Sequence, residues 1–177
     1  GVLGGPGGTG GTGAGVHLWQ VTAGEMLGNS IESVGGGKGG AGTGWGQSGG
    51  AGGIGAGVYL SETSASEFSN NTISGLEEAA GGTGGGAGTG GGTQQSYGVY
   101  LMPDSLDNAI DRTNTLEGDP IVYAWGIEGY DVEGLTITAE GNPTNLGKIA
   151  VLNSSNAQVI DNVVSHFTGE TGCSGKT

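Results

Sequence analysis

Carboxylates and one arginine form the densest set of side chains that could do chemistry. Asp104, Asp107 and Asp111 follow one another closely, and Arg112 comes directly after them. Carboxylates together with carbonyl oxygens at turns are ligands that suit Ca²⁺, so the three aspartates are a weak candidate calcium site. Glycoside hydrolysis needs two carboxylates at a defined separation, and Asp111 with Arg112 is the pair that a polysaccharide-active enzyme could use. The competing interpretation is a solvated acidic face with a surface ion pair.

The segment GETGCSGKT at 169–177 looks like a phosphate-binding loop but has the wrong spacing. The motif requires a glycine five residues before its second glycine, and Glu170 occupies that position. Nucleotide binding is therefore not predicted. His17 and His166 are far apart in the sequence and Cys173 is the single cysteine, so these residues indicate neither a metal site nor an intrachain disulfide. We predict no cofactor.

Composition excludes some partners. Four Lys and Arg residues against seventeen Asp and Glu residues give a net charge of −13, which makes nucleic acid a poor partner. No segment approaches the run of about 20 apolar residues that a membrane-spanning helix needs. An acidic chain with little lysine and cysteine favours an extracellular or cell-surface location.

The chain contains an internal repeat, which in a biased sequence is the first feature to seek. Val16, Val58 and Val99 begin three similar segments and are spaced by 42 and 41 residues. A degraded copy covers 149–167 and another covers 121–141, so the repeat has about five units. Each unit contains short runs of alternating apolar residues bounded by Gly, Ser and Asn, which predicts short strands and an all-β fold.

The pattern GVYL followed by (F/V)xxNxIxxG at 58–75, with its copies, resembles the right-handed parallel β-helix family. That family includes pectate-lyase-like enzymes, phage tailspikes and bacterial surface proteins. The resemblance implies a solenoid whose coils each carry three short strands, with asparagine at a tight turn. The equivalent asparagines are Asn29, Asn71, Asn114 and Asn162. Asparagine tolerates left-handed backbone angles, and stacked amides can hydrogen-bond along the solenoid.

His17, Tyr59 and Tyr100 occupy the same position in three units. Each follows the repeated valine and precedes a leucine, so alternation along the strand directs it outward. We expect the three side chains to form an aromatic column on the surface of the sheet.

Glycine supplies 45 of the 177 residues, concentrated in excursions at 4–15, 35–57 and 81–98. Each excursion ends just before a repeated strand, so all three leave from one corner. One interpretation is three disordered loops. The alternative uses the three-residue phase GGP-GGT-GGT, which is the period of an extended left-handed helix. That phase resembles the polyglycine II bundles of certain antifreeze proteins and phage tail adhesins, and we favour it.

The sequence therefore predicts one domain, 1–177, either whole or a section of a longer chain. The favoured function is a non-enzymatic structural subunit of an extracellular fibre or cell-surface assembly, a homo-oligomer or filament that associates through solenoid ends and glycine-rich surfaces. An adhesin or a module that binds glycan or ice is the first alternative. A polysaccharide lyase or hydrolase is the second.

Overall fold

The computed structural model describes residues 4–138 and 149–165 and is all-β in that part of the chain. Its strands form five short sheets. The first sheet contains β1 (Gly13–Trp19), β4 (Gly55–Ser61) and β7 (Ser96–Leu101). The second contains β3 (Ser30–Glu32), β6 (Thr72–Ser74), β9 (Thr115–Leu116) and β10 (Asp119–Pro120).

The third sheet is the widest, and the last two are single pairs. The third contains β2 (Glu25–Leu27), β5 (Glu67–Ser69), β8 (Asn108–Ile110), β11 (Val122–Trp125) and β14 (Ile149–Leu152). The pairs are β12 (Asp131–Glu133) with β15 (Gln158–Ile160), and β13 (Thr136–Thr138) with β16 (Val163–Ser165). No described helix is long and apolar enough to cross a membrane.

The first three repeats stack as parallel layers in the register of the sequence repeat. Val16 lies opposite Val58, which lies opposite Val99, and Ile31 lies opposite Ile73. Because equivalent residues are neighbours, the inward side chains form one continuous core around Leu60, Ile73 and Leu116, each at most 1% exposed. The alternation of apolar residues therefore places one face of every short strand in this core.

A row of asparagine amides runs through the same stack. The Nδ2 atom of Asn29 donates to Oδ1 of Asn71 at 2.9 Å, and Nδ2 of Asn71 donates to Oδ1 of Asn114 at 2.8 Å. Asn71 also donates to the Met26 carbonyl oxygen, so its buried amide is fully engaged. The left-handed backbone that we expected at the four repeated asparagines lies one residue earlier in three units, at Gly28, Asn70 and Asp161.

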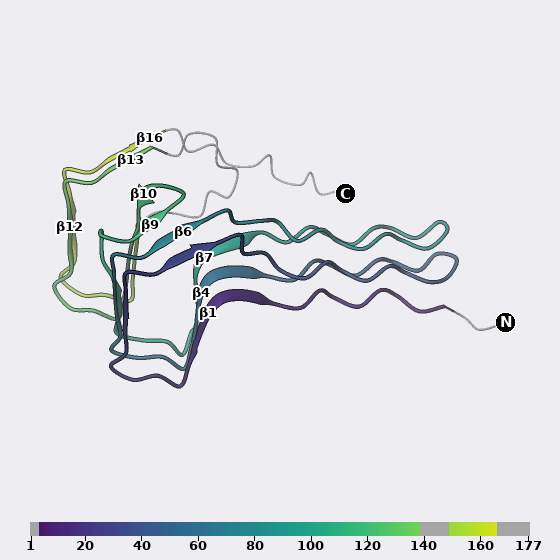
Figure 1. Cartoon of the computed structure of the whole chain (residues 1–177), viewed down its shortest axis with the longest axis horizontal. Coiled ribbons are helices and arrows are strands. Elements are labelled where there is room, and N and C mark those ends of the chain that lie inside the picture. The colour runs from purple at the N-terminus through teal and green to yellow at the C-terminus, as the bar shows by residue number, and fades with distance from the viewer. Residues whose placement is uncertain (1–3, 139–148, 166–177) are drawn as a thin grey trace.

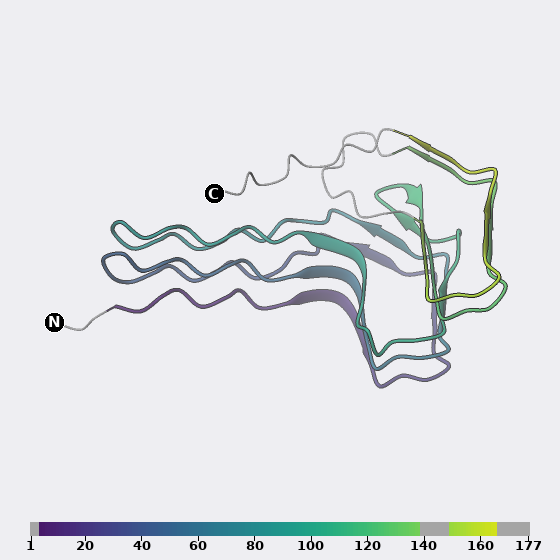
Figure 2. The same cartoon turned by 180° about the vertical axis from the view of Figure 1, so that it is seen from behind.

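Glycine-rich segments leave the corner before β1, β4 and β7 and lie side by side as long extended limbs (Figures 1 and 2). We call them the glycine layer, which comprises limbs 4–13, 36–43, 47–54, 80–85 and 88–93. The second and third excursions each run outward in one limb and return in the next (Figure 1). These limbs contain no helix or named strand beyond the first residues of β1.

Hydrogen bonds between limbs recur at every third residue. Gly7, Gly10 and Gly13 donate to carbonyl oxygens of limb 47–54 at 2.8–2.9 Å. Limb 47–54 donates in turn to limb 88–93, through the amides of Gly49 and Gly52. The outward limb 36–43 lies antiparallel to 4–13, because Gly37 and Gly40 donate to Gly11 and Gly8 respectively. It lies antiparallel to 47–54 as well, because Gly50 and Gly53 donate to Gly40 and Gly37 respectively. Backbone groups thus pair between limbs rather than remaining in solvent.

The resemblance to the right-handed parallel β-helix family is a wrong prediction, because the described strands do not form one continuous solenoid. After Leu116 the chain reverses: β9 and β10 pair antiparallel, and β11 lies antiparallel to β8. The later pairs β12–β15 and β13–β16 are parallel again but form separate two-stranded sheets. They are offset by 27 residues rather than 42, because no glycine-rich excursion intervenes.

The core divides at the same place. A second, smaller cluster contains Val122, Val132, Leu135 and Ile137. Leu135 occupies the position that asparagine holds in the earlier layers. Its backbone amide donates to Oδ1 of Asn162, just as the backbone amide of Asn29 donates to Oδ1 of Asn71. Asn162 therefore makes the same backbone contacts as the other asparagines but has no amide partner in the preceding layer.

Replacing Asn71 by Ala should lower the free energy of unfolding by about 3 kcal/mol, because it orphans the Met26 carbonyl and breaks the amide row. Asn29→Ala is the matched control. Asn29 is exposed at the end of the row, so this change should cost less than about 1 kcal/mol. Chemical denaturation of both variants measures the difference, and equal losses would contradict a structural role for the row.

Candidate functional site

Limb 4–13 forms one edge of the glycine layer, and its outer face is open. A Cβ atom added at Gly8 or Gly11 would meet nothing within 4 Å. At Gly50 and Gly53, their equivalents one layer on, it would lie 1.9 and 2.1 Å from the carbonyl oxygens of Gly8 and Gly11. The same glycine face is thus covered inside the layer and uncovered at its edge.

The backbone groups on this edge lack the partners that interior limbs have. The amides of Gly50 and Gly53 donate to limb 36–43, whereas those of Gly8 and Gly11 donate to no acceptor among the described residues. The carbonyl oxygens of Ser48 and Ala51 accept from limb 4–13, whereas those of Pro6 and Thr9 accept nothing from the described part of the chain. The edge is therefore a set of unpaired donors and acceptors at three-residue spacing.

The opposite end of the stack carries exposed apolar side chains. They belong to strands β14, β15 and β16, the last layer described: Leu152, Val159, Ile160, Val163 and Val164. Val159 and Val164 are 57% and 52% exposed, whereas their partners in the preceding layer, Val132 and Ile137, are buried. Clustered apolar exposure of this kind is typical of an interaction surface.

The aromatic residues at the equivalent strand position do lie in one column. The rings of Tyr59 and Tyr100 stack with centroids 5.3 Å apart, and His17 meets Tyr59 edge-on at 4.9 Å. Tyr97, which the repeat did not indicate, packs edge-on against Tyr100. The column follows from the in-register pairing of β1, β4 and β7, which brings equivalent side chains together.

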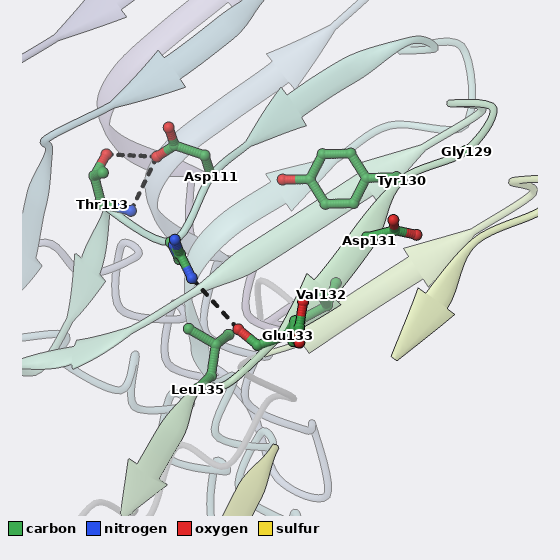
Figure 3. A pocket seen from close by; sticks show the side chains of 9 residues that line it. Asp111, Thr113, Gly129, Tyr130, Asp131, Val132, Glu133 and Leu135 are labelled. Atoms are coloured by element: carbon green, nitrogen blue, oxygen red, sulfur yellow. Dashed lines mark hydrogen bonds between the residues drawn. The ribbon is translucent and has the colours of Figure 1, made fainter. Parts of the chain in front are cut away.

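An open groove of about 420 Å³ lies between the turn at 111–113 and strand β12 (Figure 3). Arg112 lines this groove, and its Nη1 atom donates to the Glu133 carbonyl oxygen at 3.4 Å. Oδ1 of Asp111 accepts from the Thr113 amide at 3.0 Å. Asp131 and Glu133 add two further carboxylates to the rim. The groove thus combines one guanidinium and several acids with an apolar part of its lining.

Tyr130 projects into this groove with its hydroxyl directed toward the Asp111 side (Figure 3). Partial burial raises the pKa of Tyr130, and the negative charge of Asp111 raises that pKa further. The phenol is therefore neutral at physiological pH, where it can donate or accept a hydrogen bond.

The three aspartates proposed as calcium ligands are separated. Oδ1 of Asp104 accepts from the Glu62 amide, Asp107 borders a different groove beside Glu128, and Asp111 binds Thr113. Across residues 4–138 and 149–165, no group of three or more His, Cys, Asp and Glu side chains could hold a metal ion. His166, Cys173 and the segment 169–177 lie outside the described residues.

Sequence reasoning missed two features of these sites. Tyr130, Asp131 and Glu133 reach Arg112 only because the chain reverses after Leu116. The signal that could have shown this is Glu117-Gly118, a two-residue hairpin turn with positive φ at both residues. A second buried polar row was also missed: the Ser66 amide donates to Oδ1 of Asn108, and Nδ2 of Asn108 donates to the Thr63 carbonyl oxygen. Alignment of the repeats could have revealed it, since Ser66 and Asn108 are 42 residues apart.

Comparison with known proteins gives no relative: no family model, curated protein or solved structure matches this chain.

Replacing Gly50 by Ala should lower the free energy of unfolding by about 1 to 3 kcal/mol, because the new methyl group would overlap the Gly8 carbonyl oxygen. The equivalent change Gly8→Ala should leave stability unchanged or raise it slightly, since space is open there and alanine restricts the unfolded chain. Thermal or chemical unfolding of the two variants tests this pair. Equal effects would show that the limbs do not pack as described.

Asp111→Asn should lower the pKa of Tyr130, because it removes the negative charge that disfavours the phenolate. Since the folded-state pKa is raised, neutral Tyr130 stabilises the fold below pH 10, and this contribution is lost as pH rises above that value. Asp104→Asn, away from the groove, is the control. Titration of tyrosine ¹³Cζ signals measures both variants, and an unchanged Tyr130 signal in Asp111→Asn would contradict the assignment.

Proposed function

We propose that this chain is a non-enzymatic structural subunit of an extracellular fibre or cell-surface assembly, which self-associates through the ends of its stacked layers. The observation that carries the proposal is that both ends of the described stack present a surface to which a further layer could be added. One end presents limb 4–13 with unpaired backbone groups, and the other presents the exposed valines and isoleucine of β15 and β16.

The glycine layer supports this role. Its limbs are bonded at every third residue, as in a polyglycine II-like arrangement, and their backbones approach too closely for side chains between them. Such packing repeats the same contact from limb to limb, so a further limb can be added without new chemistry. Open ends of stacked repeats favour addition for the same reason.

Charge sets a condition on the assembly. The net charge of −13 opposes contact between copies through long-range repulsion, which salt screens over about 10 Å at 0.1 M. Close contacts made by backbone groups and apolar side chains do not depend on charge pairing. Association should therefore strengthen as ionic strength rises.

Analytical ultracentrifugation and negative-stain electron microscopy across protein and salt concentration test the proposal. We expect oligomers or filaments that grow with both variables. Val164→Glu should weaken them, because Val164 lies opposite the buried Ile137 and is exposed on the last described layer. Thr72→Glu, an equal charge change at an exposed position on the flank, should leave association unaltered. Dispersed monomers under all conditions would contradict the proposal and would favour a ligand-binding surface module instead.

A further inference from the structure

We propose that the outer face of limb 4–13 binds a parallel glycine-rich segment of the GGX type supplied by another chain. This inference rests on the proposed assembly role and names the chemistry of the partner. The same contact already exists within the chain, because carbonyl oxygens of limb 47–54 accept hydrogen bonds from backbone amides of limb 4–13.

This contact within the chain defines what the partner must provide. Gly7 and Gly10 of limb 4–13 donate to the carbonyl oxygens of Ser48 and Ala51 at 2.9 and 2.8 Å. The carbonyl oxygens of Pro6 and Thr9 hold the equivalent positions one layer earlier and accept no described donor. A partner with amides at three-residue spacing would therefore continue the row of parallel limbs formed by 4–13, 47–54 and 88–93.

Steric limits select glycine in the partner and in the edge. A methyl group at Gly50 would lie 1.9 Å from the Gly8 carbonyl oxygen, so the accepting limb must be bare at this position. Methyl groups at Gly7 and Gly10 would lie 2.7 Å from the nitrogens of Gly50 and Gly53, so the donating limb must be bare at the first glycine of each triplet. An ordinary strand with a side chain at every residue cannot meet either condition.

The charges near the edge agree with a neutral partner. Limb 4–13 carries no ionisable side chain, and Lys38 is the one basic residue among the described limbs. A GGX segment likewise presents only backbone dipoles and small side chains. Recognition would thus depend on hydrogen bonds and close backbone contact rather than on ion pairs.

The test uses the whole chain, ¹⁵N-labelled, and the synthetic peptide GGPGGTGGT, which has the sequence of residues 4–12. We expect saturable shifts of the Gly8 and Gly11 amide signals, with a dissociation constant in the millimolar range, because only a few bonds of about 1 kcal/mol each form. The control peptide AGPAGTAGT, with alanine at the first glycine of each triplet, should bind at least about tenfold more weakly.

On the protein, Gly8→Ala should abolish peptide binding while Thr9→Ala preserves it, because the methyl group at Gly8 points into the open face and leaves the fold intact. Absent shifts, equal binding of the two peptides, or full binding by Gly8→Ala would each overturn the inference. Sedimentation of the same samples separates the two ideas. Association without peptide binding would leave the assembly role standing, whereas peptide binding without association would contradict only that role.

Discussion

Contact between glycine backbones is the constraint on which the rest of this structure depends. Within the layer, a side chain at Gly7, Gly10, Gly50 or Gly53 would place Cβ 1.8–2.1 Å from a carbonyl oxygen of a neighbouring limb. Bare limbs can therefore approach and exchange hydrogen bonds at every third residue. Ordering glycine has a high entropic cost, and the inter-limb bonds together with the docked strands that follow must offset it. No single limb could achieve this alone, so the layer and the sheets are interdependent.

That interdependence explains the strand register of the first three layers. Each excursion leaves and returns at the same corner, so β1, β4 and β7 enter with equivalent residues opposed. The amide row of Asn29, Asn71 and Asn114 and the column of His17, Tyr59 and Tyr100 both follow from this register. Slipping one strand by a residue would break the amide row, the aromatic column and the core alternation together. The register of the first three layers is consequently fixed by three independent features: the amide row, the aromatic column and the alternation of core residues.

Beyond Leu116 this specification ends. The chain has no further glycine excursion among the described residues, the layers shorten to a 27-residue offset, and a small second core replaces the first. The same reversal brings Arg112 and Tyr130 together at the groove beside β12, and the last described layer carries exposed valines. The mixed polar groove and the cluster of exposed aliphatic side chains thus both lie in the part of the molecule that the repeat controls least. The regular part instead presents an edge made of backbone.

The sequence by itself determined the strand class, the three-residue phase of the glycine segments and the positions that face one another in the first three repeats. These follow from local periodicity, because alternation assigns faces and an equal repeat length assigns partners. The family resemblance failed because periodicity says nothing about whether sheets continue through a reversal such as Asp119–Pro120. Only the tertiary structure decided the reversal after Leu116, the groove at Arg112, the separation of the three aspartates and the open faces at the two ends of the described stack. Each depends on how layers meet in space, and that is set by non-local hydrogen bonds and by the absence of side chains between limbs.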